Sequence, residues 1–190
     1  MYKTLGVIAV TALLMNGCGA EPKPVAKPIK IKTNETTSYF NNGSVDNWSL
    51  YLGKVQYKKS NSGYIKAIPD GDSATSYFVA PNKFFGDLSS KKMLKFDIWS
   101  SGGRYFTTGY KSFGDVVIKN GNKTATYNFT SRPSKKWESM EIPLTDNGQW
   151  TLSNGTESLN DVLKNVTKIF IRAEYGVGKD YAGLDNVIFQ

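Results

Sequence analysis

Apolar and polar residues alternate with a period of two along most of the chain from about residue 39 onward. Runs of this kind lie at 54–59, 62–68, 76–80, 92–100, 104–110, 115–120, 123–130, 137–144, 168–175 and 183–189. Such alternation is typical of β-strands with one buried face. Asn-Gly and Asp-Gly pairs between the runs supply the turn residues that hairpins need. The pattern predicts eight to ten short strands.

One segment near the C-terminus follows a helical period instead. Ser158 is placed to cap a short helix, with Asp161 three residues on. Leu159, Val162 and Leu163 then fall on one face, together with Val166. We therefore expect an all-β fold, a β-sandwich of jelly-roll type with one short helix near the C-terminus.

The first 18 residues have the layout of a secretion signal. Basic Lys3 precedes an apolar run from Leu5 to Met15, which at about 11 residues is too short to span a bilayer. The cysteine at the end of this segment makes it resemble bacterial lipoprotein signals, although Met15 and Asn16 depart from their common form. The resemblance implies that Cys18 becomes the acylated N-terminus and anchors the protein in a membrane. The alternative is an ordinary signal peptide that leaves a free thiol.

Residues 19–38 are rich in proline and lysine and are predicted to be an extended tether. The lysines either are solvated or lie on anionic lipid headgroups. Gly19 is not the aspartate that retains enteric lipoproteins in the inner membrane. The predicted layout is a signal at 1–18, a tether at 19–38 and one domain at 39–190, held in the cell envelope on the extracytoplasmic side, at the outer membrane.

The residue inventory limits the chemistry. The chain has no histidine and one cysteine, which excludes His-dependent triads and most zinc sites. A glycosidase with two catalytic carboxylates remains as the enzymatic alternative. Its candidate acids are Asp97, Glu138, Glu141 and Glu174. Odd spacing places Glu138 and Glu141 on opposite strand faces, and Asp97 alternates with apolar neighbours as an outward-facing residue would.

The net charge of +8 favours anionic partners. The lysines are dispersed and the signal sequence directs export, so nucleic acid is not an expected partner. Attraction to anionic glycans or envelope polymers is the functional interpretation, and a solvated lysine-rich surface is the alternative.

Two separated motifs are specific enough to indicate a family, "SYFVAPNKFFGDLSS" with "KKMLKFDIW", and "VTKIFIRAEYGVGKDYAGLDNVIF". Together they resemble the laminin B domain, also called laminin domain IV. A looser match at "YFNNGSVDNWSLYLG", with a packed Trp48, extends the resemblance over about 40–190. It implies a non-catalytic, adhesive β-sandwich similar to carbohydrate-binding modules. Laminins carry this domain within cysteine-rich repeats, which this sequence lacks, so the resemblance does not imply their matrix role.

Aromatic residues are the candidate ligand-binding groups. Trp99, Arg104, Tyr105 and Tyr110 surround a glycine-rich turn, and Trp150, which follows Asn147, Gly148 and Gln149 and precedes Thr151, is expected to be exposed. Sugar rings stack on such aromatic faces, although most aromatics of a sandwich lie in its core.

A structural calcium ion is a candidate cofactor, by resemblance to carbohydrate-binding modules. Asp185 of the last strand, with Asp46 or Asn47 of the entry segment, is placed to bind it. The alternative is that Asp185 and Asn186 form local hydrogen bonds at a turn. In "IFIRAEY", alternation places Phe170, Arg172 and Glu174 on the outward face of a strand, where Arg172 and Glu174 are predicted to form a charged pair.

These observations predict a lipid-anchored, non-catalytic binding or adhesion module for a glycan or an envelope component. The alternatives are an envelope-structural lipoprotein without a small ligand and the carboxylate glycosidase.

Overall fold

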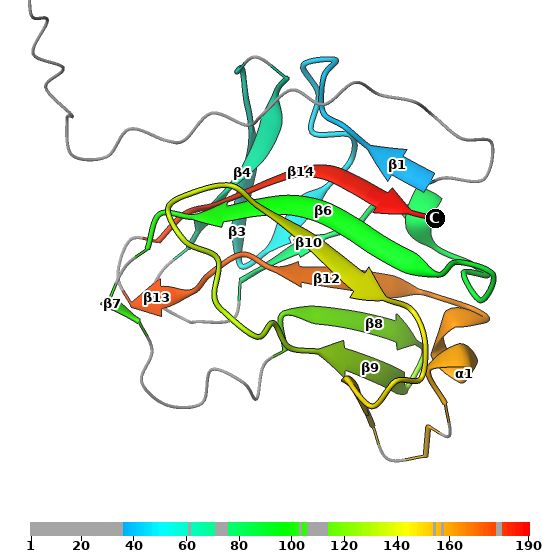
Figure 1. Cartoon of the computed structure of the whole chain (residues 1–190). Coiled ribbons are helices and arrows are strands. Elements are labelled where there is room, and N and C mark those ends of the chain that lie inside the picture. Colours follow the sequence, from blue (N-terminus) through cyan, green and yellow to red (C-terminus); the bar gives the residue numbers. More distant parts are fainter. Residues whose placement is uncertain are drawn as a thin grey trace, which may run out of the picture.

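The computed structural model of the chain describes residues 36–60, 62–70, 76–102, 104–105, 114–153, 155–156, 158–177 and 180–190, with only the backbone at 104, 105 and 177. It is a two-sheet antiparallel β-sandwich with one short α-helix, as the sequence predicts (Figure 1). The signal, Cys18 and most of the tether lie outside the described residues. No helix in the described part is long and apolar enough to cross a membrane.

The first sheet, which we call the β14 sheet, has the strand order β10-β6-β14-β4-β3, and β1 also pairs with β14. Its strands are β1 (Thr36–Ser38), β3 (Gly53–Lys58), β4 (Tyr64–Pro69), β6 (Met93–Ser100), β10 (Glu138–Pro143) and β14 (Ala182–Phe189). The last strand is therefore central, between β6 on one side and β4 with β1 on the other.

The second sheet, which we call the β12 sheet, has the order β11-β9-β8-β12-β5-β2. Its strands are β2 (Ser49–Tyr51), β5 (Tyr77–Val79), β8 (Val116–Asn120), β9 (Lys123–Tyr127), β11 (Trp150–Leu152) and β12 (Lys168–Arg172). The two-residue strands β7 (Arg104–Tyr105) and β13 (Gly176–Val177) pair at one end of the sandwich, and α1 (Leu159–Leu163) lies at the other (Figure 1). A 3-10 turn, η1, spans Asn82–Phe84.

Every predicted run contains a strand, whereas β1, β2, β11 and β13 were not predicted. Each of these has two or three residues, too few for alternation to appear. The predicted helix is confirmed, because Ser158 Oγ accepts a hydrogen bond from the Asp161 N–H at 3.2 Å. Its predicted apolar face, including Val162 and Val166, is buried against the core.

The core fills the space between the sheets. Alternate residues of the strands in both sheets point into it. Phe96 and Ile98 of β6 and Ile169 and Ile171 of β12 are examples, and all four are essentially inaccessible to solvent. Residues of opposite parity therefore face outward from the sandwich on either side. This rule determines which side chains can form a binding surface.

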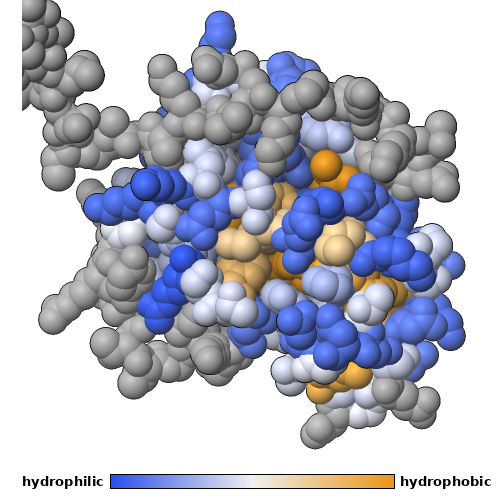
Figure 2. Space-filling view, in the orientation of Figure 1, coloured by the Kyte–Doolittle hydropathy of each residue, from blue (hydrophilic) through white to orange (hydrophobic). Residues whose placement is uncertain are grey.

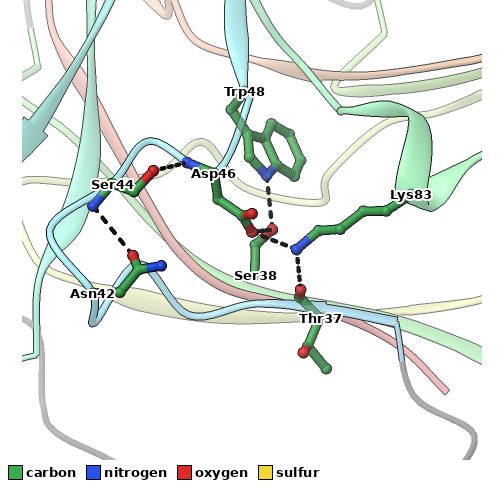
Figure 3. A network of polar contacts seen from close by, with 7 residues as sticks. All are labelled: Thr37, Ser38, Asn42, Ser44, Asp46, Trp48 and Lys83. Atoms are coloured by element: carbon green, nitrogen blue, oxygen red, sulfur yellow. Dashed lines mark hydrogen bonds and ion pairs between the residues drawn. The ribbon is translucent and has the colours of Figure 1, made fainter.

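The entry segment is fastened to the sandwich by polar contacts (Figure 3). β1 lies within the stretch predicted as a tether and pairs with β14. Trp48 is packed as expected, and its Nε1–H donates to Ser38 Oγ at 2.9 Å. The Ser38 hydroxyl donates in turn to Asp46 at 2.6 Å, and the Lys83 ammonium group binds the same carboxylate. The charge of Asp46 is therefore already balanced.

The calcium prediction has no support in the described part of the chain. Asp46 is engaged by Lys83, and Asp185 is fully buried and accepts a local hydrogen bond from the Asn186 N–H at 2.8 Å. Asn186 has a φ of 52° at a bulge in β14, which matches the local-turn alternative. Among the described residues no group of three or more acidic, histidine or cysteine side chains could hold a metal ion.

Candidate binding groove

A groove of about 610 Å³ crosses the outer face of the β12 sheet. Its lining comes from the adjacent strands β2, β5, β12, β8 and β9 and consists of Ser49, Leu50, Tyr51, Tyr77, Val79, Val117, Lys119, Thr124, Thr126, Lys168 and Phe170. At about 4.8 Å between neighbouring strands, the groove extends for roughly 19 Å. Its volume lies in the range of small-ligand sites.

Strand parity explains why these side chains line the groove. Phe170 lies between Ile169 and Ile171, which are both in the core, so its ring points to the opposite face. Val117 of β8 and Thr126 of β9 alternate with core residues in the same way. The same alternation that builds the core therefore builds the groove floor.

The pairing register orders the floor into rows that run across the strands. The middle row is Ser49, Val79, Phe170, Val117 and Thr126, each directly opposite the next. Three apolar side chains thus form the centre of the row, and a hydroxyl group stands at each end. Such a surface offers apolar contact in the middle and hydrogen bonds at the edges.

A second row contains two aromatic residues, Tyr51 and Tyr77, which lie opposite each other. Arg172 lies opposite Tyr77 on its other side. Tyr51 is 52% exposed, the most exposed large hydrophobic side chain in the described part of the chain. The Tyr77 ring meets Phe170 edge to face, with centroids 5.9 Å apart, and its hydroxyl donates to the Gly114 carbonyl oxygen at 3.2 Å. The phenol is therefore fixed, whereas Tyr51 is available to a ligand.

Burial raises the pKa of Tyr77 from 10.0 to about 12, because the phenolate would lose hydration; nearby Arg172 opposes this shift and Asp115 reinforces it. The unfolded chain then loses the tyrosine proton first, so this group costs stability between pH 10 and 12. The loss should reach about 2–3 kcal/mol by pH 12 and be absent below pH 10. Urea unfolding of wild type and Tyr77→Phe across pH 9–12 should show a shallower decline in the variant. Parallel declines would contradict the assignment.

A third row contains Lys168 of β12 opposite Lys119 of β8, which in turn lies opposite Thr124 of β9. Lys119 Nζ lies 5.9 Å from the centroid of the Phe170 ring. The basic row is therefore adjacent to the apolar centre of the floor.

A second, smaller pocket lies at the edge of the sandwich between β9 and β10 and has a volume of about 280 Å³. Figure 2 shows one face of the molecule, on which apolar residues reach the surface in several small areas bordered by polar ones. This pocket is smaller than half the groove and offers less surface to a ligand.

The tryptophans predicted to bind ligand are not available for stacking. The expected exposure of Trp150 is wrong, because its ring packs on Tyr127 with centroids 5.3 Å apart and its Nε1–H donates to the Pro143 carbonyl oxygen at 2.8 Å. Trp99 is also buried, between Tyr64 and Trp137 on the outer face of the β14 sheet.

The other predicted ligand-binding residues lack described side chains. Arg104 and Tyr105 are described only as the backbone of β7, which pairs with β13, and Tyr110 lies outside the described residues. The sequence reasoning missed Tyr51 because it belongs to a three-residue strand. The parity of 168–175 did place Phe170 on the outward face.

The acids of the glycosidase alternative do not line the groove. Asp97 faces outward as predicted but is nearly buried, and it accepts hydrogen bonds from Ser139 at 2.5 Å and Asn186 at 2.6 Å. Glu141 binds Lys95 at 2.8 Å. The remaining two candidates accept backbone N–H groups, Glu138 from Ser134 and Glu174 from Ser76. No described lining residue carries a carboxylate.

The predicted surface pair of Arg172 and Glu174 is also corrected, because both side chains are fully buried. The Arg172 Nε–H donates to the Glu174 backbone carbonyl oxygen at 2.7 Å, and the guanidinium group lies 5.6 Å from the Tyr175 ring centroid. Both charged side chains therefore lie in the interior of the domain, and Arg172 lies opposite the groove residue Tyr77.

Comparison with protein families settles the broad identity of the chain. Residues 77–190 match the model described as Laminin B (Domain IV). The chain belongs to this family. The match confirms the predicted resemblance from β5 to the C-terminus, which includes the groove residues from Tyr77 onward. A search of the curated proteins found no match.

Solved structures support the fold of this laminin B domain. The L4b domain of human laminin alpha-2 matches with a TM-score of 0.62 and 14% identity, covering 81% of this chain and 95% of that one. The family 11 carbohydrate-binding module of the Clostridium thermocellum cellulase Lic26A-Cel5E matches with a TM-score of 0.51 and 18% identity, covering 84% and 95%. At these identities the likeness concerns the fold, a sandwich shared by laminin domains and carbohydrate-binding modules.

Proposed function

We propose that this laminin B domain is a non-catalytic glycan-binding module that uses the groove on the β12 sheet. The observation that carries the proposal is the floor of the groove, an apolar and aromatic strip edged by hydroxyl groups across adjacent strands. Binding sites for small ligands combine an apolar lining with a few placed polar groups in this way.

The chemistry of the floor suits a sugar chain. Phe170 and Tyr51 offer rings on which the C–H faces of a sugar can pack, while Thr126 and Ser49 can exchange hydrogen bonds with its hydroxyl groups. The absence of carboxylates from the described lining favours binding over hydrolysis, because hydrolysis would require a pair of them. The sandwich shared with a carbohydrate-binding module supports the same interpretation.

We also propose that the module is displayed from the cell envelope. The signal-like segment ending at Cys18 would supply a lipid anchor, and residues 19–35 would link it to β1. The groove would then face the extracytoplasmic side, with the outer membrane as the proposed location.

Replacing Tyr51 with alanine should weaken glycan binding at least tenfold while leaving the melting temperature nearly unchanged, because the side chain is more than half exposed. The purified full chain would first be screened against neutral and acidic polysaccharides by affinity electrophoresis. The tightest binder would then be titrated against wild type and Tyr51→Ala.

A matched control is Gln56→Ala on β3, an exposed residue of the other sheet. It should leave the affinity unchanged. Equal affinities of wild type and Tyr51→Ala for the bound polysaccharide would contradict the groove as the site. Failure of every polysaccharide to bind would favour the alternative of an envelope-structural lipoprotein.

A further inference from the structure

Two lysines face each other directly in the groove. Lys168 of β12 and Lys119 of β8 are cross-strand partners, and both line the groove. Like charges in this position destabilise a sheet, because directly opposite Cβ atoms lie only about 5 Å apart. The repulsion between the two ammonium groups therefore destabilises the sheet, and the fold does not require lysine at these positions.

A cross-strand lysine of the other sheet does have a carboxylate partner. There Lys95 of β6 lies directly opposite Glu141 of β10, and the two side chains form an ion pair at 2.8 Å. Neither groove lysine has a carboxylate partner within the described portion of the chain, and no described lining residue is acidic. The positive charge of the groove thus remains available to a ligand.

The position of the lysines defines where an anion would bind. Along their strands they are two residues from Phe170 and Val117, a spacing of about 7 Å. Lys119 Nζ lies 5.9 Å from the centroid of the Phe170 ring. A sugar ring packed over the apolar row would therefore carry its substituents to the two ammonium groups.

From this arrangement we infer that the groove selects acidic polysaccharides, whose carboxylate or sulfate groups bind between Lys119 and Lys168. The inference rests on the proposed glycan-binding function and specifies its ligand class. An anion between the lysines replaces their mutual repulsion with two attractions, and the partly apolar surroundings reduce screening by water. Lysine suits this role because its ammonium group is a compact point charge with three rotatable donors.

The test measures the binding of three polysaccharides of similar length to the full chain at physiological salt. They are a neutral β-glucan, a polygalacturonate and a sulfated galactan. Both acidic polymers should bind at least tenfold more tightly than the neutral one. Lys119→Met with Lys168→Met should abolish this preference, so that the acidic polymers bind no more tightly than the neutral one. The double variant should be at least as stable as wild type, because it removes a repulsion.

General attraction by the basic surface is excluded with a matched control. Lys54→Met with Lys58→Met removes the same charge from β3, on the other sheet, and should change binding of the acidic polymers less than twofold. An equal loss in both double variants would overturn the inference, as would equal binding of neutral and acidic polymers. Vesicles containing phosphatidylglycerol form a further arm, and tighter groove-dependent binding to them than to either acidic polymer would also overturn it.

The two levels of the proposal fail in different ways. If neutral polymers bind as tightly as acidic ones and Tyr51→Ala weakens that binding, only the acidic preference is wrong. If Tyr51→Ala has no effect on any polymer, the groove itself is not the glycan site and both proposals are wrong.

Discussion

Replacing Arg172 with methionine should lower the free energy of unfolding by about 3–5 kcal/mol at neutral pH. Among the described residues Arg172 is the only buried cation, whereas Asp97, Asp115, Glu174, Asp180 and Asp185 are all buried. Arg172 contacts the backbone of two of these acidic residues. Its backbone N–H donates to the backbone carbonyl oxygen of Asp115, and its side-chain Nε–H donates to the backbone carbonyl oxygen of Glu174. Methionine keeps an unbranched but shorter side chain, and it removes the only buried positive charge among the described residues.

Urea unfolding at pH 7 measures this loss, and a lysine variant distinguishes charge from packing. Arg172→Lys, which retains the charge, should cost less than Arg172→Met at pH 7. A loss below about 1 kcal/mol in Arg172→Met would show that the buried acids are stabilised by other groups.

Trp150→Ala should destabilise the domain by about 3 kcal/mol, the lower end of the range for large aromatic truncations, because β11 is an edge strand. The substitution removes the contact with Tyr127 and the hydrogen bond to the Pro143 carbonyl oxygen. Thermal unfolding monitored by circular dichroism measures the loss. Trp150→Phe keeps the ring contact and should recover about half of it. An unchanged melting temperature in Trp150→Ala would contradict the burial of this side chain.

The error over Trp150 shows where sequence reasoning reaches its limit. Its immediate neighbours Gln149 and Thr151 are polar, and a single nearby apolar residue, Leu152, is too little to indicate burial. The partner that covers it, Tyr127, belongs to β9 and is brought alongside only by the β9–β11 pairing. The same holds for Arg172 and Glu174, whose alternation with core residues places them on the outer face but says nothing of what covers that face.

Local patterns succeeded where the controlling interactions are local. The helix cap at Ser158 and the alternation that fixes the core of β6 and β12 follow from neighbouring residues. The groove required five strands from distant parts of the chain to be placed in order and in register. Parity placed Phe170 outward, but its position beside Val79 and Val117 depends on the topology.

The central claim is that glycans bind on the outer face of the β12 sheet. Amide chemical-shift mapping of the isotope-labelled full chain in detergent, titrated with an oligosaccharide of a polymer that binds, tests it most directly. We expect the largest shifts at Tyr51, Val79, Val117, Thr126 and Phe170. Largest shifts on the outer face of the β14 sheet, around Trp99 and Trp137, would contradict it.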